Sequence, residues 1–299
     1  MKRVAIVGLG GVGGYLAANL SKTEDEIVGF ARGQHLQAIQ KNKITIVEDN
    51  SRWSSFIDAR TLSDADGYFD IVIFCVKSYD LLESYNAIKN HIDANSVIVS
   101  FANGVSNGDT LREISDSFVL DGCIYILSHI KEYGVIEKKG KVFTSVFGGD
   151  AKATKLLATL FEKANLKTIT PANIQKAIWK KYIFISAFAT LTSFYDKSIN
   201  YVYTHHYEEV KITLLEIASV AKVLNIEIEK EVEKALDIAK GLPAEASTSM
   251  HLDFQQHKKV ELDTLCNYII LQAQTYNVKV PQMQMMYSKL KEKVCQKKD

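Results

Sequence analysis

The sequence predicts an α/β protein of two domains, with a doubly wound parallel sheet over residues 1–170 and an all-helical domain over residues 171–299. Three observations support this prediction. The chain opens on a short apolar strand that runs directly into a glycine-rich turn. Similar apolar, β-branched runs recur through the first domain, as expected of strands that are buried on both faces of a sheet. Beyond Pro171, apolar residues recur only with the helical period.

The composition is that of an ordinary globular protein and excludes several classes of function. The 299 residues suffice for two domains, and a net charge of +1 favours neither nucleic acid nor an anionic membrane as a partner. No apolar run is long enough to span a bilayer, and the first residues do not resemble a signal peptide. The four cysteines show no metal-binding spacing, so we expect no metal site and inert thiols in a reducing cytoplasm.

The glycine-rich turn matches the fingerprint of a dinucleotide-binding, Rossmann-type domain. It lies between an apolar strand, Val4–Val7, and a helix expected over Tyr15–Leu20. Gly8 allows the tight turn, Gly10 lets the backbone approach a pyrophosphate, and Gly13 lets the helix lie against the strand. Free N–H groups at the helix start and the helix dipole attract the phosphates. The alternative interpretation is a glycine-rich turn that binds no ligand. The residues expected to bind the cofactor are Gly8, Leu9, Gly10, Gly11, Val12 and Gly13.

The end of the second strand bears on the choice of cofactor. Glu26–Ala31 is predicted as this strand, and Arg32 follows it directly. An acidic residue at this position would bind a ribose 2′-hydroxyl and favour NAD, whereas a cation matches a 2′-phosphate. The sequence therefore favours NADP(H) as the cofactor, with an ordinary exposed arginine as the alternative interpretation.

Two further buried strands end in polar residues. Asp70–Val76 is followed by Lys77, and Ser96–Ala102 is followed by Asn103. Because ligands bind beyond the carboxyl ends of the strands in a doubly wound sheet, Lys77 and Asn103 are candidate site residues. The alternative for either residue is an ordinary solvated loop.

The remaining elements of the first domain are shorter. Ile44–Glu48 and Ser54–Arg60 look like a strand pair in an excursion from the sheet, and hairpin turns are predicted around Gly134 and Gly140. Further strands are expected over Phe118–Ser128, Val135–Lys138, Val142–Phe147 and Lys167–Thr170, with a helix over Lys152–Ala164.

The second domain carries no nucleotide motif, so it should supply substrate contacts, catalytic side chains or a dimer surface. Helices are expected over Ile174–Phe194, His205–Leu224, Glu229–Lys240, Ser247–Gln256, Val260–Tyr276 and Gln282–Val294.

Two of these helices carry candidate catalytic residues. Lys180 and Lys181 interrupt a largely apolar helix and point about 100° apart, so one can face solvent while the other faces a cleft. The face of Lys181 continues through Ile185 and Ala189, and a snorkelling lysine is the alternative. In the segment Ser247–Asp263, polar residues recur at four-residue spacing. On one continuous helix they would form a slowly turning polar stripe, which is either functional or a solvated face. The stripe consists of Ser249, Asp253, His257 and Glu261, and implies no Ser–His–Asp triad because its members stack on one helix.

These segments together resemble the ketopantoate reductase (2-dehydropantoate 2-reductase) family over essentially the full chain. The family has a Rossmann domain for NADPH and an all-α C-terminal domain, an architecture like that of 6-phosphogluconate dehydrogenase, with the active site in the cleft between. The matching segments are Gly8–Gly13, Arg32, Val76–Lys77, Ala102–Gly104, Trp179–Lys181, Ser249–Asp253 and Glu261–Asp263.

The resemblance implies a role for each candidate residue. Lys181 is implied as the general acid that polarises the 2-oxo group and protonates the alkoxide when hydride arrives from the nicotinamide. Glu261 matches the acidic residue near this lysine and the substrate hydroxyl. Asn103 matches the residue beside the nicotinamide and the substrate, and Lys77 the residue at the cofactor edge. Ser249 matches a contact to the substrate carboxylate.

The sequence departs from the family pattern on the helix of Lys181. Family members typically carry asparagines four and eight residues after the lysine, where this chain has Ile185 and Ala189. The resemblance implies NADPH-dependent reduction of ketopantoate to (R)-pantoate, for pantothenate and coenzyme A synthesis, with a homodimer as one assembly that remains open. Alternatives are a reductase of another 2-oxo acid with a less polar side chain, and a non-catalytic NADP(H)-binding protein.

Overall fold

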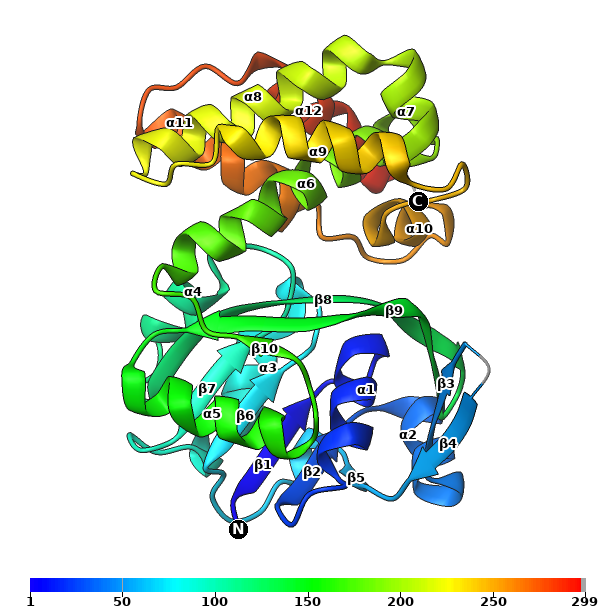
Figure 1. Cartoon of the computed structure of the whole chain (residues 1–299), viewed down its shortest axis with the longest axis vertical. Coiled ribbons are helices and arrows are strands. Elements are labelled where there is room, and N and C mark those ends of the chain that lie inside the picture. Colours follow the sequence, from blue (N-terminus) through cyan, green and yellow to red (C-terminus); the bar gives the residue numbers. More distant parts are fainter. Residues whose placement is uncertain (50, 297–299) are drawn as a thin grey trace. The chain divides into compact units, whose positions relative to one another are not determined.

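The computed structural model describes residues 1–49 and 51–296, and the chain divides into two compact units (Figure 1). Unit 1 comprises Met1–Ala102 and Ser106–Ile174. Unit 2 comprises Asn103–Val105 and Gln175–Asp299. The short segment around Asn103 is thus grouped with the helical unit, although it follows a strand of the sheet. Within the described residues, no helix has both the length and the apolar character needed to cross a membrane.

Unit 1 is built on a sheet with the strand order β4-β3-β9-β8-β7-β6-β1-β2-β5, and β10 pairs with β9. Each strand is parallel to the next along the run β5-β2-β1-β6-β7-β8. The pairs β8–β9 and β3–β4 are antiparallel. The strands are β1 (Arg3–Val7), β2 (Glu26–Phe30), β3 (Ile44–Glu48), β4 (Ser51–Ser55), β5 (Asp58–Arg60), β6 (Ile71–Phe74), β7 (Val97–Ser100), β8 (Phe118–Glu132), β9 (Val135–Gly148) and β10 (Thr168–Ile169).

Helices cover both faces of the parallel part of this sheet. Alternate residues of β1 enter two different cores: Ile6 packs with residues of α1 and α5, whereas Val7 packs with residues of α3 and α4. Burial on both faces explains why these strands are continuously apolar. The predicted Rossmann-type class is confirmed. The helices of unit 1 are α1 (Gly11–Leu20), α2 (Gly33–Asn42), α3 (Leu81–Ile88), α4 (Asn107–Arg112) and α5 (Ala151–Lys163).

Two predictions about the strands of unit 1 are wrong. Ser54–Arg60 is not one strand, because β4 pairs antiparallel with β3 while β5 pairs parallel with β2. Gly140 does not turn a second hairpin. It lies inside β9 with a positive φ of 67°, where the pairing with β8 shifts between Phe143 and Lys138. In both cases a strand changes its pairing through long-range contacts that a local pattern does not encode.

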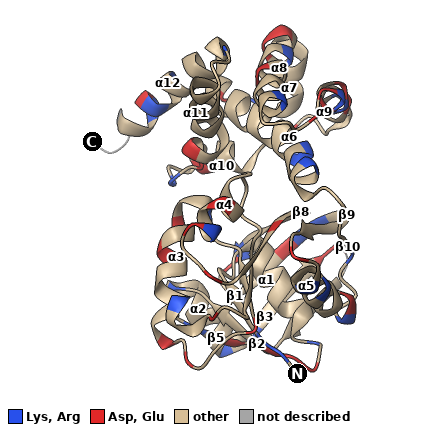
Figure 2. Ribbon diagram, turned by 90° about the vertical axis from the view of Figure 1, so that its left-hand side faces the viewer, with Lys and Arg blue, Asp and Glu red and all other residues tan. Residues whose placement is uncertain are grey.

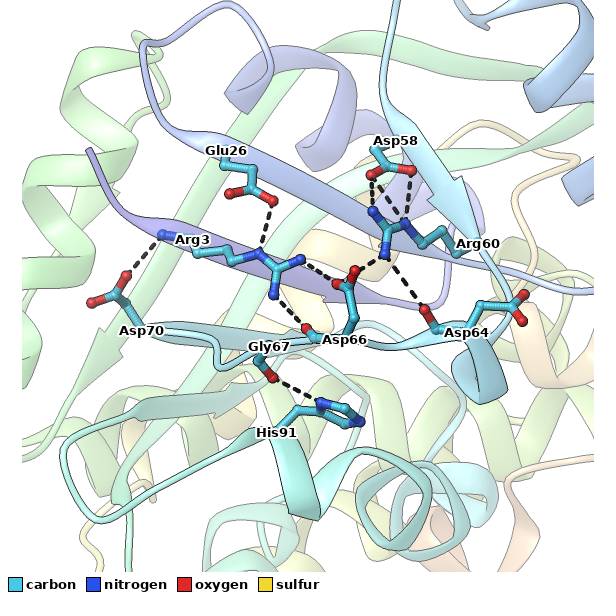
Figure 3. A network of polar contacts seen from close by, with 9 residues as sticks. All are labelled: Arg3, Glu26, Asp58, Arg60, Asp64, Asp66, Gly67, Asp70 and His91. Atoms are coloured by element: carbon cyan, nitrogen blue, oxygen red, sulfur yellow. Dashed lines mark hydrogen bonds and ion pairs between the residues drawn. The ribbon is translucent and has the colours of Figure 1, made fainter.

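A polar network ties the N-terminal strands to the loop that precedes β6 (Figure 3). Arg3 donates to Glu26 at 2.7 Å and also pairs with Asp66. Arg60 lies 2.9 Å from Asp66 and 2.6 Å from Asp58. The hydrogen bonds from Arg3 and Arg60 lower the pKa of Asp66 to about 2.

Unit 2 consists of helices joined by loops, with no strand among its described residues. Basic and acidic residues are interspersed along its helices, as the blue and red ribbon segments show (Figure 2). α8 packs against α7, α9, α11 and α12. The elements are α6 (Ile174–Tyr195), α7 (Ile199–His205), α8 (Tyr207–Val223), α9 (Lys230–Gly241), α10 (Ser249–Gln255), a π-helical turn η4 (Asp263–Asn267), α11 (Tyr268–Thr275) and α12 (Pro281–Gln296).

The sequence pattern misses the shorter helices and the breaks between neighbouring ones. It does not predict α2, α3, α4 and α7, which have ten residues or fewer. It also merges the end of α7 with α8, although His206 separates them with a non-helical backbone. Short helices present too few turns for a period to be read.

The cysteines match the expectation of inert thiols except for one exposed position. Burial raises the pKa of the Cys75 thiol, and burial raises that of Cys266 to about 12. Cys123 is buried as well, whereas Cys295 is exposed.

Candidate functional site

The glycine loop combines close backbone packing with one open position. Gly8 has a φ of +96°, and a Cβ on Gly13 would lie 1.9 Å from the carbonyl oxygen of Gly8. A Cβ on Gly11 would lie 2.4 Å from the carbonyl oxygen of Ser128. These three glycines are therefore required by the fold itself, since L side chains have no space or no permitted φ there. Gly10 differs, because a Cβ built there would meet no described atom within 4 Å.

The start of α1 has the features of a phosphate-binding helix end. The helix begins at Gly11, earlier than predicted, with Gly10 as its N-cap and no side-chain cap hydrogen bond. The first N–H groups of a helix have no partner within the helix, and the helix dipole places partial positive charge at this end. A pyrophosphate fits such a position, and a side chain at residue 10 would fill the space.

The loops after β2 and β6 carry the predicted cations. Arg32 follows β2 and is the N-cap of α2, and its side chain is 88% exposed. Lys77 follows β6 and precedes a short 3₁₀ turn that contains Asp80. The guanidinium of Arg32 lies 3.4 Å from the Asp80 carboxylate, so the two loops meet across the end of β1.

Three predicted residues form one cluster within unit 2. The Nζ of Lys181 donates to Oδ1 of Asn103 at 3.2 Å, and Nδ2 of Asn103 donates to Oε2 of Glu261 at 3.5 Å. The Asn103 amide thereby bridges a cation and a carboxylate. Glu261 is only 2% exposed, and Lys181 is half-buried. Water screens charges poorly in such surroundings. The attraction between the carboxylate and the ammonium is therefore stronger than it would be for a pair on the protein surface.

Lys180 lies apart from this cluster, as the helical spacing predicts. Its ammonium lies 3.9 Å from Glu231 of α9, and its side chain is partly exposed. The two adjacent lysines of α6 therefore have different surroundings, one at a neighbouring helix and one in the Asn103–Glu261 cluster.

The predicted polar stripe from Ser249 to Glu261 does not lie on one helix. α10 starts at the exposed Ser249 and ends at Gln255, and His257 follows with a left-handed φ of 55°. The N–H of Lys258 then bonds to the carbonyl of Asp253 at 2.9 Å, a pattern that closes a helix C-terminus. Glu261 therefore lies on a separate segment from Ser249, so the four residues form no single stripe. The break agrees with the separate helices expected over Ser247–Gln256 and Val260–Tyr276.

Comparison with known proteins assigns both units to the same family. The model of the family described as ketopantoate reductase PanE/ApbA matches residues 4–148, and its C-terminal model matches residues 173–294. The chain belongs to the ketopantoate reductase family. This membership makes the protein an oxidoreductase of the ketopantoate reductase type.

Relatives of known sequence match almost end to end at low identity. The uncharacterized oxidoreductase YkpB of Bacillus subtilis is 26% identical over 293 residues, which cover 95% of this chain and 96% of the relative. The 2-dehydropantoate 2-reductase of Mesorhizobium japonicum is 24% identical over 296 residues, with 89% and 90% coverage.

Solved structures show the same fold. A PanE/ApbA family ketopantoate reductase from Ralstonia eutropha superposes with a TM-score of 0.92 at 24% identity, covering 100% of both chains. The ternary complex of D-mandelate dehydrogenase with NADH and anilino(oxo)acetate superposes with a TM-score of 0.91 at 18% identity, covering 99% of this chain and 100% of the other.

Helix α6 also carries the hydroxyl groups of Tyr182, Ser186 and Tyr195. Tyr182 and Ser186 are buried and donate to the carbonyls of Thr264 and Leu265, at 2.8 and 2.5 Å. Tyr195 instead stacks on a histidine of the α7–α8 junction. The four-residue spacing of hydroxyls within an apolar helix was a signal for the first two contacts.

Proposed function

We propose that this protein reduces a 2-oxo acid with NADPH, and that ketopantoate, giving (R)-pantoate, is the leading candidate substrate. The observation that carries the proposal is the Lys181–Asn103–Glu261 cluster. It brings together an ammonium, an amide and a buried carboxylate that are 158 residues apart at the extremes. Carbonyl reduction needs a cation where the alkoxide forms, and Lys181 supplies it.

Each residue of the cluster has a separate task in this proposal. A bound nicotinamide supplies the hydride. Lys181 holds the 2-oxo oxygen through its ammonium and donates the proton to that oxygen when the C2–H bond forms. Glu261 places a negative charge on the far side of the Asn103 amide, which attracts the Lys181 ammonium and holds it in place. Asn103 sets the separation of the two and offers its amide to the substrate.

Unit 1 supplies the cofactor contacts in the same proposal. The open space at Gly10 and the uncapped start of α1 suit the pyrophosphate. Arg32 is exposed and suits a 2′-phosphate, which supports NADPH over NADH. Lys77 is proposed at the cofactor edge, and Ser249 as a contact to the substrate carboxylate.

Helix α6 bears on which 2-oxo acid is the substrate. Ile185 is half-buried and Ala189 is buried, so no amide stands on the Lys181 face one and two turns further along. The hydroxyls of Tyr182 and Ser186 are bonded to backbone carbonyls. A 2-oxo acid with a more apolar side chain is therefore the second candidate substrate, and a structurally similar enzyme is a D-mandelate dehydrogenase.

Steady-state turnover distinguishes ketopantoate, a more apolar 2-oxo acid and the absence of any catalysis. The wild type is assayed with NADPH and NADH against ketopantoate and a panel of 2-oxo acids with aliphatic and aromatic side chains. Ile185→Asn is assayed in parallel. If ketopantoate is the substrate, we expect Ile185→Asn to raise kcat/KM for ketopantoate. If an apolar 2-oxo acid is the substrate, the same change lowers kcat/KM for that acid. Binding of NADPH without turnover of any 2-oxo acid would leave the non-catalytic alternative.

A further inference from the structure

The π-helical turn η4 is the irregular element nearest to Glu261. It covers Asp263–Asn267 and begins two residues after Glu261. The N–H of Tyr268 bonds to the carbonyl of Asp263, five residues earlier, in place of the usual four. A π turn inserts one residue into a helix, which leaves carbonyl groups that need partners from elsewhere.

Three hydroxyl groups of α6 contact successive residues of this turn. The phenol of Tyr182 donates to the Thr264 carbonyl at 2.8 Å, and Ser186 donates to the Leu265 carbonyl at 2.5 Å. One helical turn further, the hydroxyl of Thr190 lies 2.8 Å from the Cys266 sulfur. Together these contacts, Tyr182–Thr264, Ser186–Leu265 and Thr190–Cys266, are named here the hydroxyl ladder.

The hydroxyl ladder is buried away from solvent, and the Tyr182 ring is held in place by aromatic packing. Tyr182 and Ser186 are 1% and 0% exposed, so water does not compete for their hydrogen bonds. The Tyr182 ring packs edge-on against Trp179 and Tyr268, with centroids 5.3 and 6.2 Å away. The phenol is therefore aimed by packing, and loss of the hydroxyl alone would leave that packing in place.

The ladder connects the two charged members of the site through short covalent paths. Lys181 is the residue directly before Tyr182, and Glu261 lies three residues before Thr264. Any shift of η4 along α6 would therefore move Glu261 relative to Lys181. The Asn103 amide bridges them, and its bond to Glu261 is 3.5 Å long. A bond of this length is at the limit of hydrogen bonding and would not survive a shift of half an ångström.

We propose that Tyr182 and Ser186 are positioning residues that fix the register of η4 on α6 and so hold Glu261 against Asn103 and Lys181. This inference rests on the proposed function, in which Lys181 is the proton donor. The irregular turn is then part of how the site is built, since a regular helix would satisfy its own carbonyls and would leave α6 no hydrogen bonds with which to fix it.

The test uses Tyr182→Phe, Ser186→Ala and the double variant in the full chain, with Tyr195→Phe as the matched tyrosine control on the same helix. The first readout is the side-chain amide signal of Asn103 in ¹H–¹⁵N NMR spectra, assigned by its loss in Asn103→Ala. We expect this signal to move in the ladder variants and to stay in place in Tyr195→Phe. An unmoved signal in the folded double variant overturns the proposal, and this readout does not depend on turnover.

The second readout is steady-state kinetics with NADPH and the best 2-oxo acid. We expect each ladder variant to lose about 10- to 100-fold in kcat, because a displacement of about 1 Å costs that much, while the Kd for NADPH stays unchanged. A purely structural role would lower the Tm and leave kcat per folded molecule unchanged, which would overturn the proposal. A wild type that turns over no 2-oxo acid would refute the proposed function, and the NMR signal would still decide the role of the ladder.

Discussion

Arg32 is the side chain on which the proposed preference for NADPH rests. Its guanidinium is exposed and lies 3.4 Å from Asp80, a weak pair that a phosphate with up to two charges can outcompete. We expect Arg32→Ala to weaken NADPH binding by about 10- to 100-fold and to leave NADH nearly unchanged. Asp80→Asn should instead tighten NADPH binding, because it removes a carboxylate beside the 2′-phosphate. Cofactor titrations followed by fluorescence measure both, and equal wild-type affinity for the two cofactors would contradict the assignment.

In the proposed function, Lys181 is the residue on which turnover depends. We expect Lys181→Ala to lower kcat by about 10²–10⁴, the usual contribution of a positioned acid, while NADPH binding survives. Lys180→Ala is the control, because that lysine lies near Glu231 of α9 instead of the Asn103–Glu261 cluster. Steady-state kinetics of both variants provide the measurement. A large loss in Lys180→Ala with none in Lys181→Ala would mean that the other lysine is the proton donor.

At the scale of elements, two glycines of the β1–α1 turn have different roles: Gly10 is expected to matter for cofactor binding and Gly13 for stability of the fold. We expect Gly10→Val to abolish NADPH binding with little change in Tm, since its side chain enters open space with an extended backbone. Gly13→Val should destabilise the protein by about 1–3 kcal/mol or more, because its Cβ would collide with the Gly8 carbonyl. Calorimetry and cofactor titration distinguish the two. Retained NADPH binding in folded Gly10→Val would show that the cofactor does not approach this loop.

For the molecule as a whole, the Arg3–Asp66–Arg60 network predicts part of the acid stability. Asp66 has a pKa of about 2 in the folded chain, below its ordinary 3.8, because both arginines donate to it. A lowered carboxylate pKa stabilises the fold above the ordinary value, and this stabilisation is lost as the pH falls from about 4 to about 2. We expect Asp66→Asn to have a lower Tm than the wild type at pH 6, and the difference to vanish near pH 2. Other carboxylates titrate in both proteins, so a difference independent of pH would contradict the role of Asp66.

The whole-molecule architecture also explains which parts of the site could be predicted. Residues of the glycine loop, Arg32 and Lys77 each follow a strand whose apolar run is continuous, and a parallel sheet brings such strand ends to one edge. The strand and its following residue are both local features. The divergence of Lys180 and Lys181 is likewise fixed by the 100° step of an α-helix.

Other features were decided only by tertiary structure. The sequence alone determined a Rossmann-type sheet, a helical second half and the candidate side chains, because these follow from apolar periods and from glycines at fixed spacing. It did not determine the π turn after Glu261. This turn has carbonyl groups whose partners lie elsewhere, the Tyr182 and Ser186 hydroxyls about 80 residues away along the chain. A period describes one helix at a time, whereas these contacts join two helices, and only the folded chain brings them together.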